Sequence, residues 1–367
     1  MDLKHISHDD LGAPGSITVE PSHGMIQAYL LKDAVFQHLE QMKTKGWENK
    51  FGDEHFAQRR EKASTADNKS RLRLFNMMQA IGKEMQDATG AFSFSNKMIQ
   101  VLDLCMAPGG FAAYSLQENP MGVVDAFSLP EAEGGHPVLI PRRDTRVRVY
   151  FTDITMWAGE LGVDNIPEDH PDASKFCSAW PYSCKAYDLI ICDGQALHTR
   201  EVAAYRNRTE QTRLINSQLV LGIQRIRTGG TMIILLHKPF NWRCVRLLHM
   251  FSRFSDIQLF KPRKFHAEKS SFYLVAKNVQ PKSEAAIQAT TTFKRSWYCA
   301  TFRTDQSEEE VHELRRDDIL STLTEFGAAF IELARPLWAI QAAALGEASW
   351  MRRDGIEEST SDNKVAY

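Results

Sequence analysis

The sequence contains no run of about 18 consecutive apolar residues, the minimum for a membrane-spanning helix. We therefore expect no such helix and no membrane partner. The first ten residues carry charges and lack an apolar centre, which argues against a secretory signal. Overall composition, with 43% hydrophobic and 25% charged residues in 367, is that of an ordinary globular protein. These figures exclude a wholly disordered chain, a collagen-like fibre and a disulfide-stapled miniprotein.

Cysteine is sparse, with six residues spread along the chain. Cys105 and Cys192 lie inside apolar runs, as reduced buried thiols do. Cys177 and Cys184 have no second pair and no clustered histidines beside them, so we expect no metal site. This usage predicts an intracellular protein, cytoplasmic or nuclear, rather than a secreted one.

The net charge of −2 is unevenly distributed. Residues 304–367 carry a net charge of −8, which leaves +6 for residues 1–303. An acidic end behind a mildly basic body is compatible with a polyanionic partner, and equally with a solvated surface.

Seven apolar or alternating segments predict β-strands, and several of them are separated by helical patterns. The strands are expected at 98–105, 122–129, 147–153, 188–194, 231–238, 256–260 and 270–277. The helices are expected at 25–42, 70–86, 207–227 and 241–254. Nearly continuous apolar runs are typical of parallel strands covered on both faces. The last two strands are joined without a helix, which predicts an antiparallel hairpin. The sequence thus predicts an α/β fold with a seven-stranded, mostly parallel sheet and a terminal hairpin.

The most informative segment is 103–111, Asp-Leu-Cys-Met-Ala-Pro-Gly-Gly-Phe, which follows the first expected strand. Glycines let the backbone approach a ligand, and the N-terminus of the next helix offers free N–H groups. Ligands bind at the carboxyl ends of parallel strands. The dinucleotide fingerprint G-x-G-x-x-G and the Walker lysine are both absent. For the two glycines alone, an ordinary strand-to-helix turn remains an alternative.

The whole segment resembles the cofactor-binding motif of the FtsJ/RrmJ-type RNA 2′-O-methyltransferases, which include the mRNA cap-ribose enzymes. Further resemblances follow in order: 187–194 looks like the family's fourth strand, 218–236 like its next helix and fifth strand, and 256–277 like its closing hairpin. The resemblance covers about 70–278. It implies a Rossmann-like fold, S-adenosylmethionine (SAM) as cofactor, and methyl transfer to an oxygen of an RNA ribose.

This resemblance divides the chain into four parts. Residues 1–69 form an N-terminal arm and helical region, 70–278 the methyltransferase domain, 279–353 a helical C-terminal appendage and 354–367 a disordered tail. Within the appendage, helical spacing over 304–350 predicts helix rather than strand, with Pro336 as a break or kink.

The resemblance also implies a set of cofactor-binding residues. They are Asp103, Ala107, Pro108, Gly109, Gly110 and Phe111 around the methionine part, and Asp153 at the adenine. The acid that binds the cofactor's ribose is left open between Asp125, the region of Ser128, Glu131 and Glu133. His136, in the loop after the second strand, is a further candidate for approaching the cofactor or an ordinary turn residue.

The family's catalytic set is Lys-Asp-Lys-Glu, and this sequence keeps it only in part. The aspartate matches at Asp193. The central lysine position falls on Leu235, with Lys238 three residues later as the available replacement. The first lysine position falls on Phe75 or Asn76, and the glutamate position on Ser271; the neighbours that could substitute are Lys69, Lys83 and Glu268. We predict Asp193 and Lys238 as the residual catalytic pair.

An RNA partner is expected, because arginines and lysines flank the expected strand ends and can contact phosphates. These residues are Arg200, Arg206, Arg208, Arg213, Arg243, Arg246, Arg253, Lys261, Arg263, Lys264 and Lys269. The long insert 155–188 either covers the acceptor site or packs on the sheet. Two alternatives to an RNA enzyme stand beside this interpretation: a non-catalytic SAM- or RNA-binding descendant of the fold, and a methyltransferase for a small-molecule hydroxyl.

Overall fold

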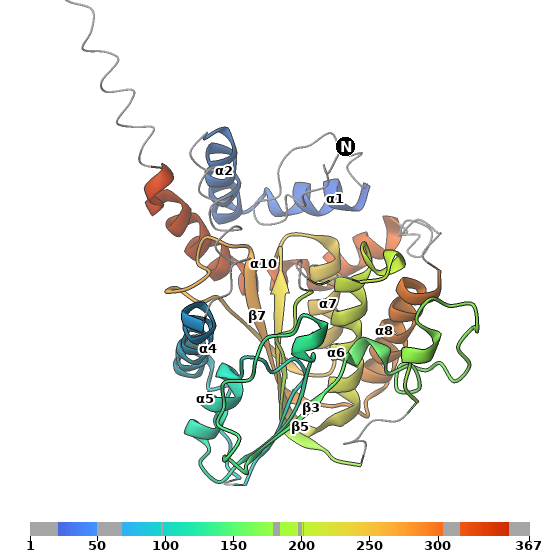
Figure 1. Cartoon of the computed structure of the whole chain (residues 1–367). Helices are drawn as coiled ribbons and strands as arrows, with labels where there is room; N and C mark the ends of the chain where they lie inside the picture. Colours follow the sequence, from blue (N-terminus) through green and yellow to red (C-terminus); the bar gives the residue numbers. More distant parts are fainter. Residues whose placement is uncertain are drawn as a thin grey trace, which may run out of the picture.

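The computed structural model describes residues 21–49, 68–96, 98–178, 184–196, 200, 202–303 and 316–351. The expected tail at 354–367 and the polar segment 50–67 lie outside these residues. A single sheet forms the centre of the molecule, with helices on both faces (Figure 1).

The sheet has seven strands in the order β3-β2-β1-β4-β5-β7-β6. The strands are β1 (Gln100–Asp103), β2 (Val123–Ser128), β3 (Val147–Phe151), β4 (Tyr187–Cys192), β5 (Ile226–His237), β6 (Asp256–Phe260) and β7 (Ser271–Val279). The first five pair in parallel, and β7 is antiparallel to both β5 and β6. The predicted fold class, including the terminal hairpin, is confirmed.

Helices cover the two faces of the sheet as separate layers (Figure 1). One layer consists of α4 (Asn68–Thr89) and α5 (Gly110–Glu118); the other consists of α6 (Glu210–Arg225), α7 (Trp242–Ser252) and α8 (Glu284–Phe302). Successive side chains of a β-strand point to opposite faces of the sheet, so each central strand contributes alternately to the apolar cluster on either face. On β5, for example, Ile234 and Leu236 join the α6–α7 cluster, whereas Ile233 and Leu235 join the α4–α5 cluster.

The Gly229-Gly230 pair does not form a turn ahead of the fifth strand. β5 begins at Ile226, which pairs with Tyr187, and the register shifts before Thr231 pairs with Leu189. Gly229 has φ +83°, a conformation that glycine adopts without strain. The glycines therefore form an irregularity inside a longer strand than predicted.

The expected helix at 25–42 is two helices, α1 (Pro21–Leu30) and α2 (Ala34–Glu48). Asp33 caps α2 by accepting hydrogen bonds from the N–H groups of Val35 and Phe36, at 2.9 and 3.1 Å. A capping carboxylate at this place explains the break, because it satisfies donors that a new helix leaves free. Asp33 also accepts hydrogen bonds from Arg335, 302 residues further along the chain.

Arg335 belongs to the long helix α10 (Arg316–Glu347), which packs against α2 near the end of β5 (Figure 1). The indole of Trp338 donates to the carbonyl of Pro239 at 3.1 Å. The prediction of helix rather than strand is confirmed for the described part of 304–350. Pro336 does not end α10, which continues to Glu347.

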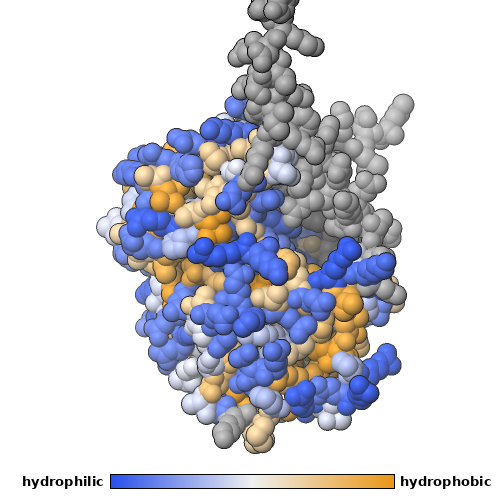
Figure 2. All heavy atoms as spheres, turned by 90° about the vertical axis from the view of Figure 1, so that its left-hand side faces the viewer, coloured by the Kyte–Doolittle hydropathy of each residue, from blue (hydrophilic) through white to orange (hydrophobic). Residues whose placement is uncertain are grey.

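Among the described residues, α10 is the helix whose length and composition would suffice to cross a membrane. In this protein its apolar side chains Phe330, Leu337 and Trp338 are buried among those of α2 and the sheet layer. The left-hand side of Figure 1, which includes α4 and α5, presents a mostly hydrophilic surface with apolar patches between (Figure 2).

Candidate functional site at the carboxyl edge of the sheet

The loop between β1 and α5 has the shape expected of a ligand-binding turn. Gly109 has φ +103°, in the left-handed region that disfavours other residues. A Cβ on Gly110 would lie 2.5 Å from both the Phe75 carbonyl oxygen and the Met78 side chain, so the start of α5 touches α4. The Pro108 carbonyl accepts a hydrogen bond from Leu139 N–H at 3.0 Å, which ties the loop to the segment after β2.

The segment after β4 is held by a buried amide. Gln218 of α6 accepts a hydrogen bond from Gly194 N–H at 2.8 Å and donates one to the Gly194 carbonyl at 3.1 Å. A Cβ on Gly194 would collide with Cys105 Sγ at 2.3 Å. Asp193 is thus fixed beside the β1 loop. We did not single out Gln218 from the sequence; the signal was a glutamine beginning an otherwise apolar helical run, Gln-Leu-Val-Leu.

Asp103 and Asp193 lie close together at this edge. Asp103 is buried, and its Oδ1 accepts a long hydrogen bond from Cys105 N–H, at 3.3 Å. Its Oδ2 has no hydrogen-bond partner among the described residues. Burial, with the neighbouring Asp193 charge, raises the pKa of Asp103 to about 8. Burial also raises the pKa of Asp193 to about 7. Within the described residues, these acids have no cationic partner in the site.

Tyr273 is the polar side chain that contacts Asp193. Its hydroxyl donates to Asp193 Oδ1 at 3.1 Å and acts to lower the pKa of that carboxyl. Burial and the Asp193 charge raise the pKa of Tyr273 itself, so the phenol stays protonated. Tyr273 pairs across the sheet with Leu235, the position that the resemblance assigns to the family's central lysine. The side chain beside Asp193 is therefore the phenol of Tyr273, whereas the family resemblance implies the amine of a lysine there.

Asp153, predicted at the adenine, is surrounded by donors from its own chain. Its Oδ1 accepts from the N–H and hydroxyl of Thr155, and its Oδ2 from Arg200 and Arg206 at 2.9 and 2.8 Å. Burial acts to raise the pKa of Asp153, but the two guanidinium groups hold it well below its usual value. Both arginines also reach Glu210. Both oxygens of Asp153 already accept hydrogen bonds from the protein, so a hydrogen bond to the adenine of the cofactor would have to share one of them.

Asp125 is a structural acid. It is buried in β2 and accepts hydrogen bonds from Arg148, Lys185 and Tyr187 at 2.7, 2.8 and 3.0 Å. These three donors occupy both oxygens of its carboxylate. Of the alternatives for the ribose-binding acid, Glu133 lies in the short helix η1 (Glu131–Glu133) and reaches Arg200 at 3.4 Å.

Lys238 follows directly after β5 in a tight turn, with φ +54°. Its N–H donates to the Ser270 carbonyl at 3.1 Å, and its carbonyl accepts from the N–H groups of Phe240 and Asn241. Its charge contributes to lowering the pKa of the buried Lys43 of α2, after burial itself. Lys238 is therefore near enough to Lys43 for the two charges to interact. Its pairing with Asp193 stays a prediction.

The remaining candidates for the catalytic set are elsewhere. Lys83 pairs with Asp87 at 3.5 Å on the exposed face of α4. Ser271 is buried, with a hydroxyl that has no partner among the described residues. Lys261 is also buried and donates to the carbonyls of His266, Lys269 and Ser271, at 3.2, 2.5 and 3.0 Å. Burial lowers the pKa of Lys261 to about 7. Its ammonium group binds three carbonyls at the β6–β7 loop, so it is not exposed for the phosphate contact that we expected.

The eleven expected phosphate contacts differ in burial: Arg200, Arg246 and Lys269 are half-buried, Lys261 is buried and Arg253 is exposed. Arg206 and Arg213 are buried, at 3% and 0% exposure, and neighbour carboxylates and carbonyls, so they are not available to RNA. Arg208, Arg243, Arg263 and Lys264 are exposed. The described part of the insert 155–188 packs behind the sheet: Trp297 of α8 donates to the Thr155 carbonyl at 3.1 Å.

The residues at this edge fit SAM in charge and shape. SAM carries an ammonium and a sulfonium group, both positively charged. The Asp103 carboxyl has an oxygen without a hydrogen-bond partner among the described residues, and its pKa is raised. A cation beside it would stabilise its ionised form. The left-handed Gly109 and the close Gly194 keep side chains out of the space beside it. Among the described residues, no three metal-binding side chains gather.

The strand order, the terminal hairpin and a glycine loop at the carboxyl edge define a Rossmann-like methyltransferase. The model of one family, described as FtsJ-like methyltransferase, matches residues 83–279. The chain belongs to the FtsJ-like methyltransferase family. The family resemblance expected over 70–278 is confirmed, while the domain limits drawn around it stay a prediction.

One curated relative is the cap-specific mRNA (nucleoside-2'-O-)-methyltransferase of Autographa californica nuclear polyhedrosis virus, 26% identical over 183 residues. The alignment covers 48% of this chain and 63% of the viral protein, less than two thirds of its length. Among solved structures, a putative ribosomal RNA methyltransferase from Plasmodium falciparum matches with 16% identity and TM-score 0.34, covering 54% of this chain and 96% of its own. The N-methyltransferase NodS from Bradyrhizobium japonicum matches with 12% identity and TM-score 0.34, covering 55% and 98%.

Proposed function

We propose that this protein is an intracellular SAM-dependent methyltransferase that methylates a ribose 2′-hydroxyl of RNA. The observation that carries the proposal is the Asp103–Asp193 pair, two acids with raised pKa values beside a left-handed glycine loop. Family membership and the viral relative's name agree with it. The exposed cations Arg208, Arg263 and Lys264 are available for the phosphates of the RNA.

The cofactor would be held by the loop 103–111. Asp103 would neutralise the cation, Gly109 and Gly110 would leave room for the methionine part, and Ala107, Pro108 and Phe111 would line it. Asp153 would act at the adenine through its shared oxygens. When bound, SAM supplies an electrophilic methyl group.

Asp193 would accept the proton of the acceptor hydroxyl as the new oxygen–carbon bond forms. With a pKa of about 7, an appreciable fraction of this carboxyl is ionised at neutral pH, as a general base requires. Tyr273 would hold the carboxylate in place through its hydroxyl. Lys238 would act on the acceptor hydroxyl from the end of β5.

The test combines methyl-labelled SAM with total cellular RNA, followed by digestion to nucleosides. Label in 2′-O-methylnucleosides is the expected result. Lys238→Ala separates the two catalytic assignments: a loss of several orders of magnitude with unchanged SAM affinity supports Lys238, and full activity leaves Asp193 with Tyr273 as the centre. Lys282→Ala, which removes an exposed lysine just ahead of α8 that has no assigned role in RNA binding, serves as the control for lost charge.

A second candidate is a non-catalytic SAM- or RNA-binding protein. It is favoured by Leu235, Ser271 and Phe75, which stand where the family's two lysines and glutamate are expected. Calorimetry distinguishes it: SAM binding without label in any nucleoside supports the binding protein. Label in a small-molecule fraction instead would identify a different acceptor.

A further inference from the structure

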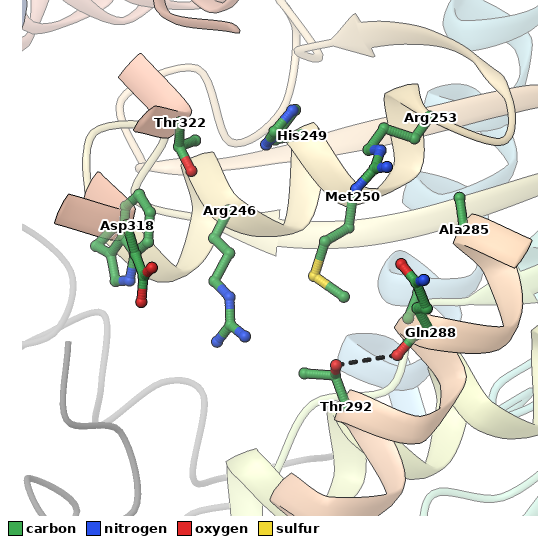
Figure 3. A pocket seen from close by; sticks show the side chains of 11 residues that line it. Arg246, His249, Met250, Arg253, Ala285, Gln288, Thr292, Asp318 and Thr322 are labelled. Atoms are coloured by element: carbon green, nitrogen blue, oxygen red, sulfur yellow. Dashed lines mark hydrogen bonds between the residues drawn. The ribbon is translucent and has the colours of Figure 1, made fainter. Parts of the chain in front are cut away.

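A hollow of about 380 Å³ lies between α7, α8 and α10, away from the Asp103–Asp193 site (Figure 3). One face of α7 lines it with Trp242, Arg246, Met250 and Arg253, which recur at the spacing of helical turns. α8 and α10 form the other walls. Its size is within the range of about 300–1,000 Å³ that small-molecule sites occupy.

Arg246 is the central charge of this hollow. Its side chain is half-buried and points into the open space between the helices (Figure 3). Within the described residues it has no hydrogen bond and no ion pair. Burial lowers the pKa of Arg246, and the Asp318 charge acts the other way. A guanidinium has five N–H donors, and leaving them without acceptors in a half-buried place costs free energy.

The other charged groups leave the hollow positive. Arg253 is exposed at one end of it. His249 faces Glu325 at 3.5 Å and stacks on Phe326, and burial is the largest influence that lowers its pKa. Asp318 is then the single carboxylate of the described lining, against two arginines.

We propose that this hollow binds the phosphate of a nucleotide. A planar guanidinium matches phosphate oxygens through two parallel hydrogen bonds, which makes Arg246 the anchor and Arg253 a second charge at the mouth. Met250 and Trp242 offer apolar surface to a base. The Gln288 amide nitrogen donates to Glu284 at 3.0 Å, which leaves its carbonyl to accept from a base amino group.

The nucleotide is either a free mononucleotide or part of an RNA strand. The hollow shares no residue with the cofactor loop or with Asp193, so the proposal does not rest on the proposed function. Asp193→Asn should bind the same ligand equally well.

The experiment titrates the full chain with AMP, with adenosine and with a short single-stranded RNA, by calorimetry. Arg246→Ala should weaken phosphate-dependent binding by about ten- to a hundredfold, the effect of a lost charge-assisted hydrogen bond. Arg246→Lys should restore part of it. Arg295→Ala, which removes an exposed arginine of α8, is the matched control. Thermal unfolding and SAM affinity show whether each variant is folded.

Binding of AMP but not adenosine, lost in Arg246→Ala alone, supports a site for free nucleotides. Binding of RNA without AMP, lost in the same variant, supports a site for a strand. Two outcomes overturn the proposal: no binding of either phosphate-bearing probe to the wild-type chain, or equal weakening by Arg246→Ala and Arg295→Ala.

Discussion

Two pairs of aspartates at the sheet show how the same side chain takes opposite roles. Asp125 and Asp153 are surrounded by arginine, lysine and hydroxyl donors of the chain itself. Asp103 and Asp193 have raised pKa values, and among the described residues no cation binds either of them; Asp193 accepts a hydrogen bond from the Tyr273 hydroxyl. Folding supplies hydrogen-bond donors to the first pair, and we propose that a bound ligand supplies the charge that the second pair needs. Whether an acid has a charged partner in the fold is therefore a better guide to a binding site than its position in a sequence motif.

The largest effect should come from Asp193→Asn, which keeps the shape and removes the proton acceptor. We expect methyl transfer to fall by about 10²- to 10⁴-fold, the usual contribution of general base catalysis. SAM affinity should change little. Single-turnover rates with labelled SAM measure the first quantity and calorimetry the second. Activity near the wild-type level would place Asp193 with the structural acids.

On the other side of the comparison, Arg206→Ala should destabilise the fold. Arg206 itself is buried, and its loss leaves the part-buried carboxylates Asp153 and Glu210 short of a partner; breaking a buried ion pair costs about 3–5 kcal/mol. The free energy of unfolding in urea measures the loss. Arg208→Ala, an exposed neighbour, is the control and should change it by no more than about 0.5 kcal/mol.

The pH dependence of stability should distinguish the pairs as well. Asp103 and Asp193 ionise in the unfolded chain near pH 4 but in the fold only near pH 8 and pH 7. Between these values the folded state binds more protons, so the free energy of unfolding should fall as the pH rises from about 4 to 8.

A bound cation favours the ionised acids, so SAM affinity should rise with pH across the upper part of this window, with release of protons on binding. Thermal unfolding from pH 5 to 9, with and without SAM, measures both effects. Asp103→Asn should flatten the slope. An unchanged slope in that variant would show that Asp103 is already satisfied in the protein.

The smallest effect should be that of Tyr273→Phe. The lost hydrogen bond lowers the pKa of Asp193 in the wild type, so the midpoint of the pH–rate profile should move upward by up to about one pH unit. The rate at pH 9 should be nearly restored, because the acid is ionised there in both proteins. A uniform loss at every pH would point to a structural role for Tyr273 instead.

Much of the framework followed from the sequence. The apolar runs located all seven strands, and the absent helix between the last two predicted the hairpin. Local patterns failed where tertiary contacts decide: α1 and α2 are separated at Asp33, which is bound to Arg335 from the far end of the chain. Pro336 remains inside α10, whose packing on α2 stabilises the helix through it. The Gly229-Gly230 pair became a strand irregularity because β4 and β7 pair on either side of it.

The sequence by itself determined the glycine loop, the family and the position of Asp193, because these depend on residues that lie near one another in the chain. Only the tertiary structure decided which acids are satisfied. The three donors of Asp125 lie 23, 60 and 62 residues away in the chain. The two arginines that bind Asp153 lie 47 and 53 residues away. Tyr273 reaches Asp193 across 80 residues, and no local pattern records that contact. Charge compensation depends on distance in space, and only folding sets that distance.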